Sequence, residues 1–207
     1  MQVSLKASGL KKIFNRRVIF DGVGFALGRG ETLLITDRNG SGKSTLVKII
    51  ADVLTPSAGK VTLSRDGIPV SEHRHRLFGL VSPYLQLYDE FSAEENLHLA
   101  QRIRGLCEEP GESDRLLSFL GICQRKRDPV RTYSSGMKQR AKYAMALIHR
   151  PPVLILDEPM SNLDAEGFDA VRTVMQDQRD EGILVVATND LADVDHYEHR
   201  IDLNAGR

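Results

Sequence analysis

The amino-acid sequence predicts an α/β protein with a mainly parallel sheet, a small antiparallel β layer beside it and an inserted α-helical subdomain. An apolar run of strand length at 32–36 leads into a glycine-rich loop and then into a helical pattern. Two further apolar runs, at 153–156 and 183–187, are separated by a helical pattern, and the order strand, helix, strand implies parallel pairing. Residues 85–150 show helical periodicity, which indicates an insertion into one α/β body.

The first elements along the chain are β-type. Short runs of this kind with many turn glycines occupy the first 35 residues, and another follows at 59–63. We therefore expect an antiparallel layer beside the strand at 32–36. After the loop that follows this strand, apolar residues recur at helical spacing, which predicts a helix with an inner face of Leu46, Val47, Ile49, Ile50 and Val53.

The loop at 37–45 reads DRNGSGKST, close to the phosphate-binding pattern G-x-x-x-x-G-K-[ST]. In such a loop, backbone N–H groups at a helix N-terminus surround the β-phosphate of a nucleotide, and glycines let the main chain come that close. Lys43 would bridge the β- and γ-phosphates, and the hydroxyl of Ser44 would bind Mg²⁺. The sequence therefore predicts a P-loop NTPase core, with nucleotide contacts from Asn39, Gly40, Ser41, Gly42, Lys43, Ser44 and Thr45.

Asp37 stands where the phosphate-binding pattern has glycine. One unpaired charge roughly 6 Å from the phosphates would oppose binding by about 3 kcal/mol at an effective dielectric near 20, as an upper bound. Water, Mg²⁺ and the neighbouring Arg38 would screen this charge, and Asp tolerates unusual backbone angles. We expect weakened rather than abolished nucleotide binding.

The helical insertion is predicted to contain three helices. The first begins at Ser92, which forms a capping box with Glu95, and ends at Gly105. The second ends at Gly121, and the third follows Ser135. The expected apolar faces of these three helices are, in order, Leu97, Leu99, Ala100 and Ile103; Leu116, Leu117 and Leu120; and Ala141, Ala144, Met145 and Ile148. The helix predicted between the two later strands has an expected apolar face of Phe168, Val171, Val174 and Met175.

The apolar strand at 153–156 ends in two carboxylates, Asp157 and Glu158. Parallel sheets bind their ligands at the carboxyl ends of the strands. Asp157 would hold Mg²⁺, usually through water, and Glu158 could accept a proton from the water that attacks the γ-phosphate. We interpret this segment as a Walker B strand that completes a hydrolytic site with the P-loop.

Two further segments make the pattern specific to one family. YSSGMKQR at 133–140 resembles the LSGGQ signature of ABC-type ATPases, and SNLD at 161–164 resembles their D-loop. The order and spacing agree over nearly the whole chain. The resemblance implies a head-to-tail homodimer that sandwiches two ATP molecules, each between the P-loop of one subunit and the signature of the other. Hydroxyl and N–H donors at the start of a helix suit an anion, and here they are offered by Ser134, Ser135 and Gly136.

The same resemblance places an adenine-stacking aromatic at Phe14, for which a buried core phenylalanine is the alternative. It also implies that 1–207 forms a single ABC ATPase domain. Within that domain, 1–84 and 151–207 would form the nucleotide-binding α/β core. The segment 85–150 would form the helical subdomain that carries the signature.

Three positions depart from the family pattern. Asp37 is the first, and Pro83 is the second because it stands where a glutamine is usual and offers neither an amide side chain nor an N–H. Gln86 could replace that glutamine only if the loop is rearranged. The third is Asn189, in the usual place of a histidine; its amide can donate a hydrogen bond to a γ-phosphate but cannot be protonated. We expect slow ATP hydrolysis, with Glu158, Lys43 and Asn189 catalytic and Ser44 and Asp157 binding the metal.

Composition excludes several classes of protein. The 28 Lys and Arg balance 28 Asp and Glu, so no global field draws the chain to nucleic acid. Cys107 and Cys123 lack the spacing of a zinc site or disulfide framework and suit a reducing cytoplasm. No apolar stretch approaches 18 residues, so we expect a soluble protein that reaches a membrane through a partner.

These observations favour the ATP-binding and ATP-hydrolysing subunit of an ABC transporter, with separate integral membrane permease subunits and a peripheral location on the inner face of the cell membrane. The short chain resembles the small haem-exporter or cytochrome c biogenesis type. One alternative is a soluble ABC ATPase for assembly or repair, such as the iron–sulfur scaffold kind. Another is a degenerate, non-hydrolysing nucleotide-binding regulator. The sequence does not specify the cargo, which the permease would select.

Overall fold

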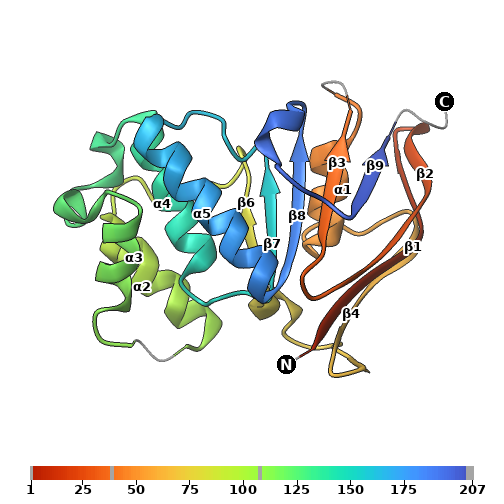
Figure 1. The fold of residues 1–207 in the computed structure, drawn as a ribbon, viewed down its shortest axis with the longest axis horizontal. Helices are drawn as coiled ribbons and strands as arrows, with labels where there is room; N and C mark the ends of the chain where they lie inside the picture. The colour runs from red at the N-terminus through yellow and green to blue at the C-terminus, as the bar shows by residue number, and fades with distance from the viewer. Residues whose placement is uncertain (1, 38–39, 107–108, 204–207) are drawn as a thin grey trace.

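The computed structural model describes residues 2–37, 40–106 and 109–203. At its centre is a five-stranded parallel sheet in the order β6-β7-β8-β3-β9 (Figure 1). The strands are β3 (Thr32–Thr36), β6 (Phe78–Val81), β7 (Val153–Asp157), β8 (Ile183–Thr188) and β9 (His199–Asp202). Most of these strands are rich in Leu, Ile and Val, as parallel strands buried on both faces are. The prediction of a mainly parallel sheet is confirmed.

A second, antiparallel sheet has the order β2-β1-β4-β5. Its strands are β1 (Val3–Phe14), β2 (Arg17–Gly28), β4 (Ala58–Arg65) and β5 (Ile68–Pro69). The β1–β2 hairpin turns at Asn15 and Arg16, both with positive φ, which is the backbone of a tight two-residue hairpin. The predicted antiparallel layer is confirmed, although its first two strands are longer than the short runs expected from the sequence.

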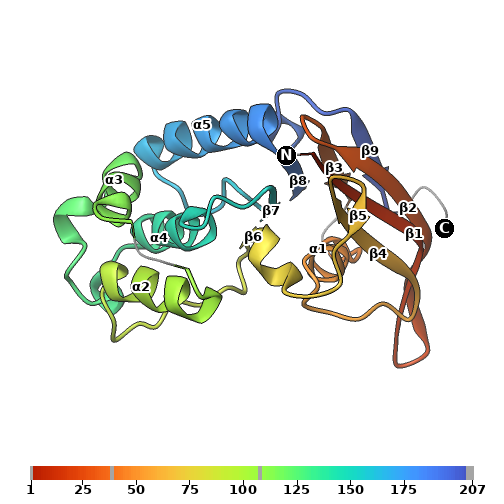
Figure 2. The ribbon, with the colours of Figure 1, turned by 90° about the horizontal axis from the view of Figure 1, so that it is seen from below.

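The helices lie on both sides of the parallel sheet. Figures 1 and 2 show α2 to α5 gathered on one side, and α1 with the antiparallel sheet on the other. The helices are α1 (Lys43–Ile50), α2 (Ala93–Arg104), α3 (Glu112–Phe119), α4 (Ser135–Leu147) and α5 (Ala165–Glu181), with 3₁₀ turns at Arg74–Leu77, Cys123–Arg125, Val130–Thr132 and Leu191–Asp193. Since α2, α3 and α4 fall between β6 and β7 in the chain, they form the expected helical insertion.

Side chains alternate between the two faces of each parallel strand and so contribute to two cores. Leu154 and Leu156 of β7 pack in the core formed with α2 to α5. Val153 and Ile155 of the same strand pack in the core formed with α1 and the antiparallel sheet. Because the sheet is held between two cores, the functional residues at its carboxyl edge stand on a rigid support.

Three residues predicted to be buried are exposed instead. Val53 is 65% exposed because α1 ends at Ile50, before the helical pattern reaches it. Ile103 is 67% exposed because it lies about 90° around α2 from the buried face, at about 100° per residue. Phe168 is 38% exposed and lies at the edge of the buried face of α5. The capping box of Ser92 and the helix end at Gly105 form as predicted.

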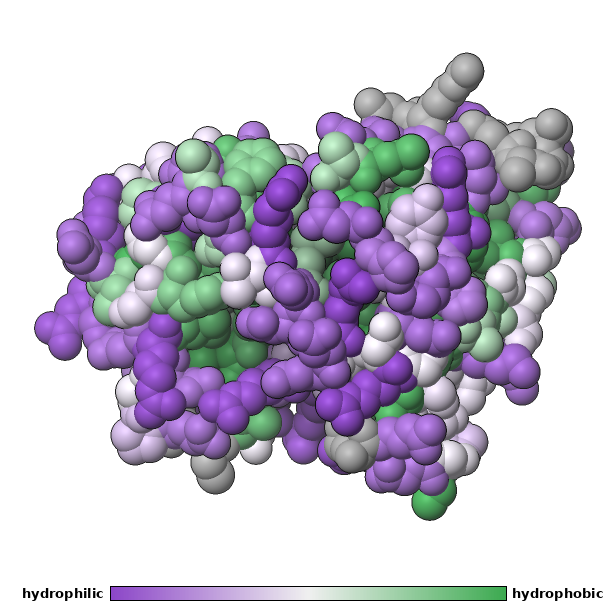
Figure 3. All heavy atoms as spheres, viewed as in Figure 1, coloured by the Kyte–Doolittle hydropathy of each residue, from purple (hydrophilic) through white to green (hydrophobic). Residues whose placement is uncertain are grey.

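Polar residues cover most of the face shown in Figure 3, with small hydrophobic patches between them. Among the described residues, no helix combines the length and the apolar character needed to cross a lipid bilayer.

Candidate nucleotide-binding and hydrolysis site

The loop between β3 and α1 has the backbone that a phosphate-binding loop needs. Gly40 and Gly42 adopt positive φ values of 80° and 114°. A Cβ atom on Gly42 would lie 2.4 Å from Cγ2 of Ile19 on β2, so only glycine fits there. The side chain of Ser41 is buried, and its hydroxyl oxygen makes no hydrogen bond among the described residues. Of the predicted contacts, Asn39 lies outside the described residues.

Lys43 is buried at the start of α1, and its ammonium group joins three segments of the chain. It donates hydrogen bonds to the backbone oxygen of Asp37, at 2.9 Å, and to the side-chain oxygen of Asn189. Its nitrogen also lies 3.9 Å from a carboxylate oxygen of Glu158. The structure therefore brings together all three residues predicted to be catalytic.

Asp157 ends β7 and is buried beside two hydroxyl groups. Ser44 and Ser82 both hydrogen-bond to its carboxylate, Ser82 at 3.3 Å to Oδ2. Its other oxygen, Oδ1, is buried and has no hydrogen-bond partner among the described residues. Burial raises the pKa of Asp157, and the two hydroxyls and Lys43 oppose the shift. Ser82 was not predicted as a site residue, because only its register opposite Asp157 places it here.

Glu158 is the first residue after β7 and has a positive φ of 52°. Its N–H donates to the backbone oxygen of Ala187 on the neighbouring strand β8, at 2.8 Å, which fixes this turn to the sheet edge. Burial raises the pKa of Glu158, Lys43 lowers it, and the nearby carboxylates of Asp157 and Asp193 raise it further. A carboxylate with a raised pKa is a better proton acceptor than an ordinary one.

The donor set at this edge fits a magnesium ion. A buried carboxylate oxygen of Asp157, which has no hydrogen-bond partner in the described part of the chain, lies near the Ser44 hydroxyl, and hard oxygen ligands of this kind suit Mg²⁺. Among the described residues there is no group of three or more His, Cys, Asp or Glu side chains that could hold a metal alone.

The predicted signature residues lie at the start of α4. Ser134 caps the helix by accepting a hydrogen bond from the N–H of Met137 at 3.2 Å. Ser134 and Ser135 are exposed, whereas Gly136 is buried. A Cβ atom on Gly136 would lie 3.3 Å from Oδ2 of Asp164, in the predicted D-loop. Figures 1 and 2 place α4 and α1 on opposite sides of β6 and β7. Within one chain the signature is therefore separate from the P-loop.

Phe14 is 44% exposed at the end of β1, where the ammonium group of Lys12 lies 4.7 Å from its ring centre. The alternative of a buried core phenylalanine is wrong, because this ring lies in solvent at the hairpin. β2 of the same hairpin contacts the P-loop through Ile19. The ring therefore lies exposed on the hairpin whose second strand contacts the P-loop.

Pro83 lies in the loop after β6, and its backbone oxygen accepts a hydrogen bond from Lys142 of α4 at 3.4 Å. Gln86, considered as a substitute for the missing glutamine, is exposed and lines a cavity of about 320 Å³ with Lys138 and Lys142. The structure thus places Gln86 against α4, while Ser82 contacts the carboxylate of Asp157.

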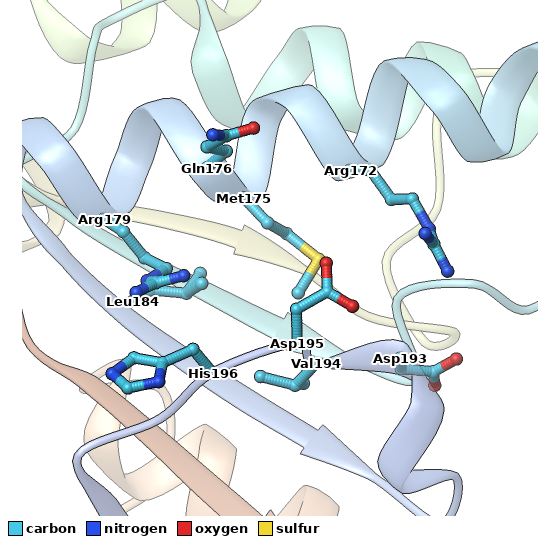
Figure 4. Close-up of a pocket in the computed structure, with 9 residues that line it drawn as sticks. All are labelled: Arg172, Met175, Gln176, Arg179, Leu184, Asp193, Val194, Asp195 and His196. Atoms are coloured by element: carbon cyan, nitrogen blue, oxygen red, sulfur yellow. The ribbon is translucent and has the colours of Figure 1, made fainter.

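A further cavity of about 410 Å³ lies between α5 and the segment after β8 (Figure 4). Its charged lining includes Arg172, Arg179, Asp193 and Asp195. It borders the site indirectly, because Asp193 accepts a hydrogen bond from the hydroxyl of Thr188, the residue before Asn189. The predicted nucleotide contacts lie at the P-loop and not in this cavity.

Comparisons with known proteins agree with this geometry. A family model described as "ABC transporter" matches residues 20–161, which include the P-loop, the signature and the two carboxylates. The linearmycin resistance ATP-binding protein LnrL of Bacillus subtilis (strain 168) is 28% identical over 207 residues, which cover 98% of this chain and 64% of LnrL. The cytochrome c biogenesis ATP-binding export protein CcmA of Rhodopseudomonas palustris (strain BisB5) is 32% identical over 185 residues, which cover 88% of this chain and 90% of CcmA.

A solved structure supports the fold. The dimeric, post-hydrolysis ATP-binding cassette MJ0796, bound to ADP and Pi, is similar with a TM-score of 0.84 and 22% sequence identity. The match covers 96% of this chain and 94% of that one. The chain thus spans nearly the whole of this cassette but about two thirds of LnrL.

Proposed function

The chain belongs to the ABC transporter family of ATP-binding, ATP-hydrolysing domains, and from this premise we propose that it powers transport through membrane-spanning subunits that are separate chains. One observation carries the catalytic part of the proposal. The ammonium group of Lys43 lies between Asn189 and Glu158 at the carboxyl edge of the parallel sheet. The cation that would bind phosphate, Lys43, and the carboxylate that would accept a proton, Glu158, therefore lie side by side.

The roles of the residues follow from their positions. Lys43 would bind the β- and γ-phosphates, and the backbone N–H groups at the start of α1 would bind the β-phosphate. Glu158 would accept the proton of the attacking water, and its raised pKa favours that transfer. The side chain of Asn189 would position the ammonium group of Lys43 relative to the terminal phosphate. Mg²⁺, when bound by Ser44 and Asp157, supplies positive charge to the phosphates.

We further propose that the active form is a head-to-tail homodimer. Ser134 and Ser135 are exposed at the start of α4, and α4 and α1 lie on opposite sides of β6 and β7, so these serines would meet ATP on a second subunit. Phe14 at the exposed hairpin would stack on adenine. The domain division stays part of this proposal, with 85–150 as the helical subdomain and 1–84 with 151–207 as the core.

The proposed location is cytoplasmic, at the inner face of the cell membrane, where permease subunits would hold the chain. The similar proteins LnrL and CcmA are named for linearmycin resistance and for cytochrome c biogenesis export, respectively. Both names concern functions that a separate permease can specify. We therefore assign the energy-supplying role to this chain and the choice of cargo to its partner.

Phosphate release from ATP by the purified chain tests the enzymatic part. Lys43→Met should lose at least about 100-fold in turnover, because the charge that stabilises the transferred phosphoryl group is removed. Lys60→Met is the matched control, since Lys60 is exposed on β4, and it should keep wild-type turnover. Equal turnover in Lys43→Met and wild type would refute the assignment of the site.

Membrane fractionation tests the transport part. In the cells that produce the protein, most of it should sediment with membranes and be released with permease subunits by mild detergent. Recovery of most of the chain in the supernatant, bound to soluble partners, would refute the transporter role and support an assembly or repair ATPase.

A further inference from the structure

Ser82 lies at the carboxyl end of β6, beside the predicted metal site. β6 pairs in parallel with β7, and Val81 is in register with Leu156. The next residues on the two strands are Ser82 and Asp157, both buried. Ser82 is therefore placed by the sheet itself, one residue before the position where the sequence lacks a glutamine.

The hydrogen bonds around Ser82 define what its hydroxyl can do. Its oxygen accepts from the N–H of Tyr84 at 3.4 Å, and its backbone oxygen accepts from the N–H of Leu85 at 3.0 Å. Since one lone pair is used by Tyr84, the hydroxyl proton can point at Oδ2 of Asp157, 3.3 Å away. The turn after β6 thus orients this hydroxyl toward the carboxylate.

The carboxylate of Asp157 is held asymmetrically. The hydroxyls of Ser82 and Ser44 contact it, while Oδ1 stays buried without a partner among the described residues. A buried carboxylate oxygen without a partner is costly unless a cation or another donor meets it. The hydrogen bond from Ser82 fixes Oδ2 of Asp157, and this leaves Oδ1 to bind a cation or another donor at the site.

Pro83 cannot supply this contact. It has no amide side chain and no N–H, and its backbone oxygen contacts Lys142 on α4. In the loop after β6, Ser82 therefore contacts the carboxylate of Asp157, and Pro83 contacts Lys142 in the helical insertion.

We propose that Ser82 is a positioning residue of the magnesium site, which holds Asp157 so that Oδ1 faces the ion. The proposal rests on the proposed function, because it takes Mg²⁺ with ATP as the bound pair. It gives the role of orienting this carboxylate to Ser82, which directly precedes the proline that stands in place of the usual glutamine.

The test uses Mn²⁺ as a paramagnetic probe, titrated into the full chain with a non-hydrolysable ATP analogue and followed by the free Mn²⁺ signal. Ser82→Ala should weaken Mn²⁺ affinity by about tenfold, the lower end of the usual effect of losing a hydrogen-bond partner of a metal ligand. ATP affinity in EDTA should stay within about twofold of wild type, since a single hydrogen bond at the metal carboxylate is not a phosphate contact. Ser82→Thr keeps a hydroxyl and should stay close to wild type in Mn²⁺ affinity.

Three controls separate this proposal from the function on which it rests. Ser44→Ala and Asp157→Asn should weaken Mn²⁺ binding, and if neither does, the metal site itself is wrong. Ser64→Ala, on β4 away from the site, should bind Mn²⁺ as wild type does. If Ser44→Ala weakens Mn²⁺ binding and Ser82→Ala does not, the role of Ser82 alone is refuted. Parallel loss of metal-free ATP binding in Ser82→Ala would also refute it, because it would mean a general structural role.

Discussion

The ammonium group of Lys43 donates a hydrogen bond to the side-chain oxygen of Asn189, 146 residues further along the chain. The bond joins the start of α1 to the end of β8. It also fixes which end of the Asn189 amide faces the lysine, because the amide oxygen accepts the hydrogen bond. A neutral histidine could reproduce this acceptor, but a protonated one would repel Lys43.

That relationship predicts a difference in pH dependence between wild type and Asn189→His. In wild type, turnover should rise with pH through the raised pKa of Glu158, because only the ionised carboxylate accepts a proton. The midpoint should lie above that of an ordinary glutamate, and no titration near pH 6.5 should follow. Asn189→His should add a second titration below the ordinary histidine value, because the neighbouring ammonium group of Lys43 disfavours the protonated imidazole. Turnover measured from pH 4.5 to 9 checks this, and identical profiles for the two proteins would contradict it.

Asp37→Gly should bind ATP more tightly, by about 1–2 kcal/mol, because a negative charge beside the phosphates is removed. The backbone oxygen that receives Lys43 stays in place in this variant. The gain should shrink as salt rises and should be largest for magnesium-free ATP. Calorimetry at low and high salt measures it.

Asp37→Asn is the matched control for that change, since it removes the charge and keeps the shape. It should show most of the same gain. Unchanged or weaker ATP binding by both variants would mean that the carboxylate of Asp37 does not act on the phosphates.

Ser135→Arg should leave ATP binding to the single chain intact while blocking dimer formation and hydrolysis. Ser135 is exposed in the first turn of α4, so the single chain can accommodate an arginine there, whereas in the proposed dimer it would obstruct ATP on the second subunit. Ser118→Arg on the exposed side of α3 is the control and should dimerise normally. ATP affinity and light scattering with ATP distinguish the cases. Equal loss of ATP binding by the monomer would show that the signature belongs to the site of its own chain.

Protonation of His149 should account for part of the loss of folding stability in acid. Burial lowers the pKa of His149 to about 4, with the charge of Arg104 acting in the same direction, and its Nε2 lies 3.0 Å from the backbone oxygen of Phe78. Between this pKa and the ordinary value of 6.5, the unfolded chain binds the proton more readily than the folded one. Stability should therefore fall as pH drops through this window, by up to about 3 kcal/mol.

His149→Gln is the variant that tests this assignment, because an amide can still donate to Phe78 but cannot titrate. Urea unfolding at pH 4.5 and 7 should show a smaller loss of stability at the lower pH in the variant than in wild type. An equal loss in the two proteins would assign the acid sensitivity to other groups.

The sequence predicted those parts of the site that are encoded within one short segment. The strand at 32–36, the glycines of the loop and Lys43 follow one another, and each was placed correctly because the chemistry of phosphate binding demands that local order. Asp157 and Glu158 were placed by the same reasoning at the end of an apolar strand. The capping box at Ser92 is equally local.

Features that depend on pairing between distant segments were not predicted. β9 is short and mixed in polarity, and it is a strand because β3 offers its free edge. Ser82 becomes a site residue only through the register of β6 on β7. The exposure of Ile103 depends on which face of α2 meets α4, and periodicity in one helix does not fix that choice.

The central claim is that Glu158 is the proton acceptor for ATP hydrolysis at a site shared by two subunits. The most direct measurement is phosphate release by Glu158→Gln, together with size-exclusion chromatography in ATP. Because the amide keeps the shape and cannot accept the proton, the variant should bind ATP, accumulate as a dimer and lose nearly all turnover. Wild-type turnover by Glu158→Gln, or a monomer that binds ATP without dimerising, would contradict the account.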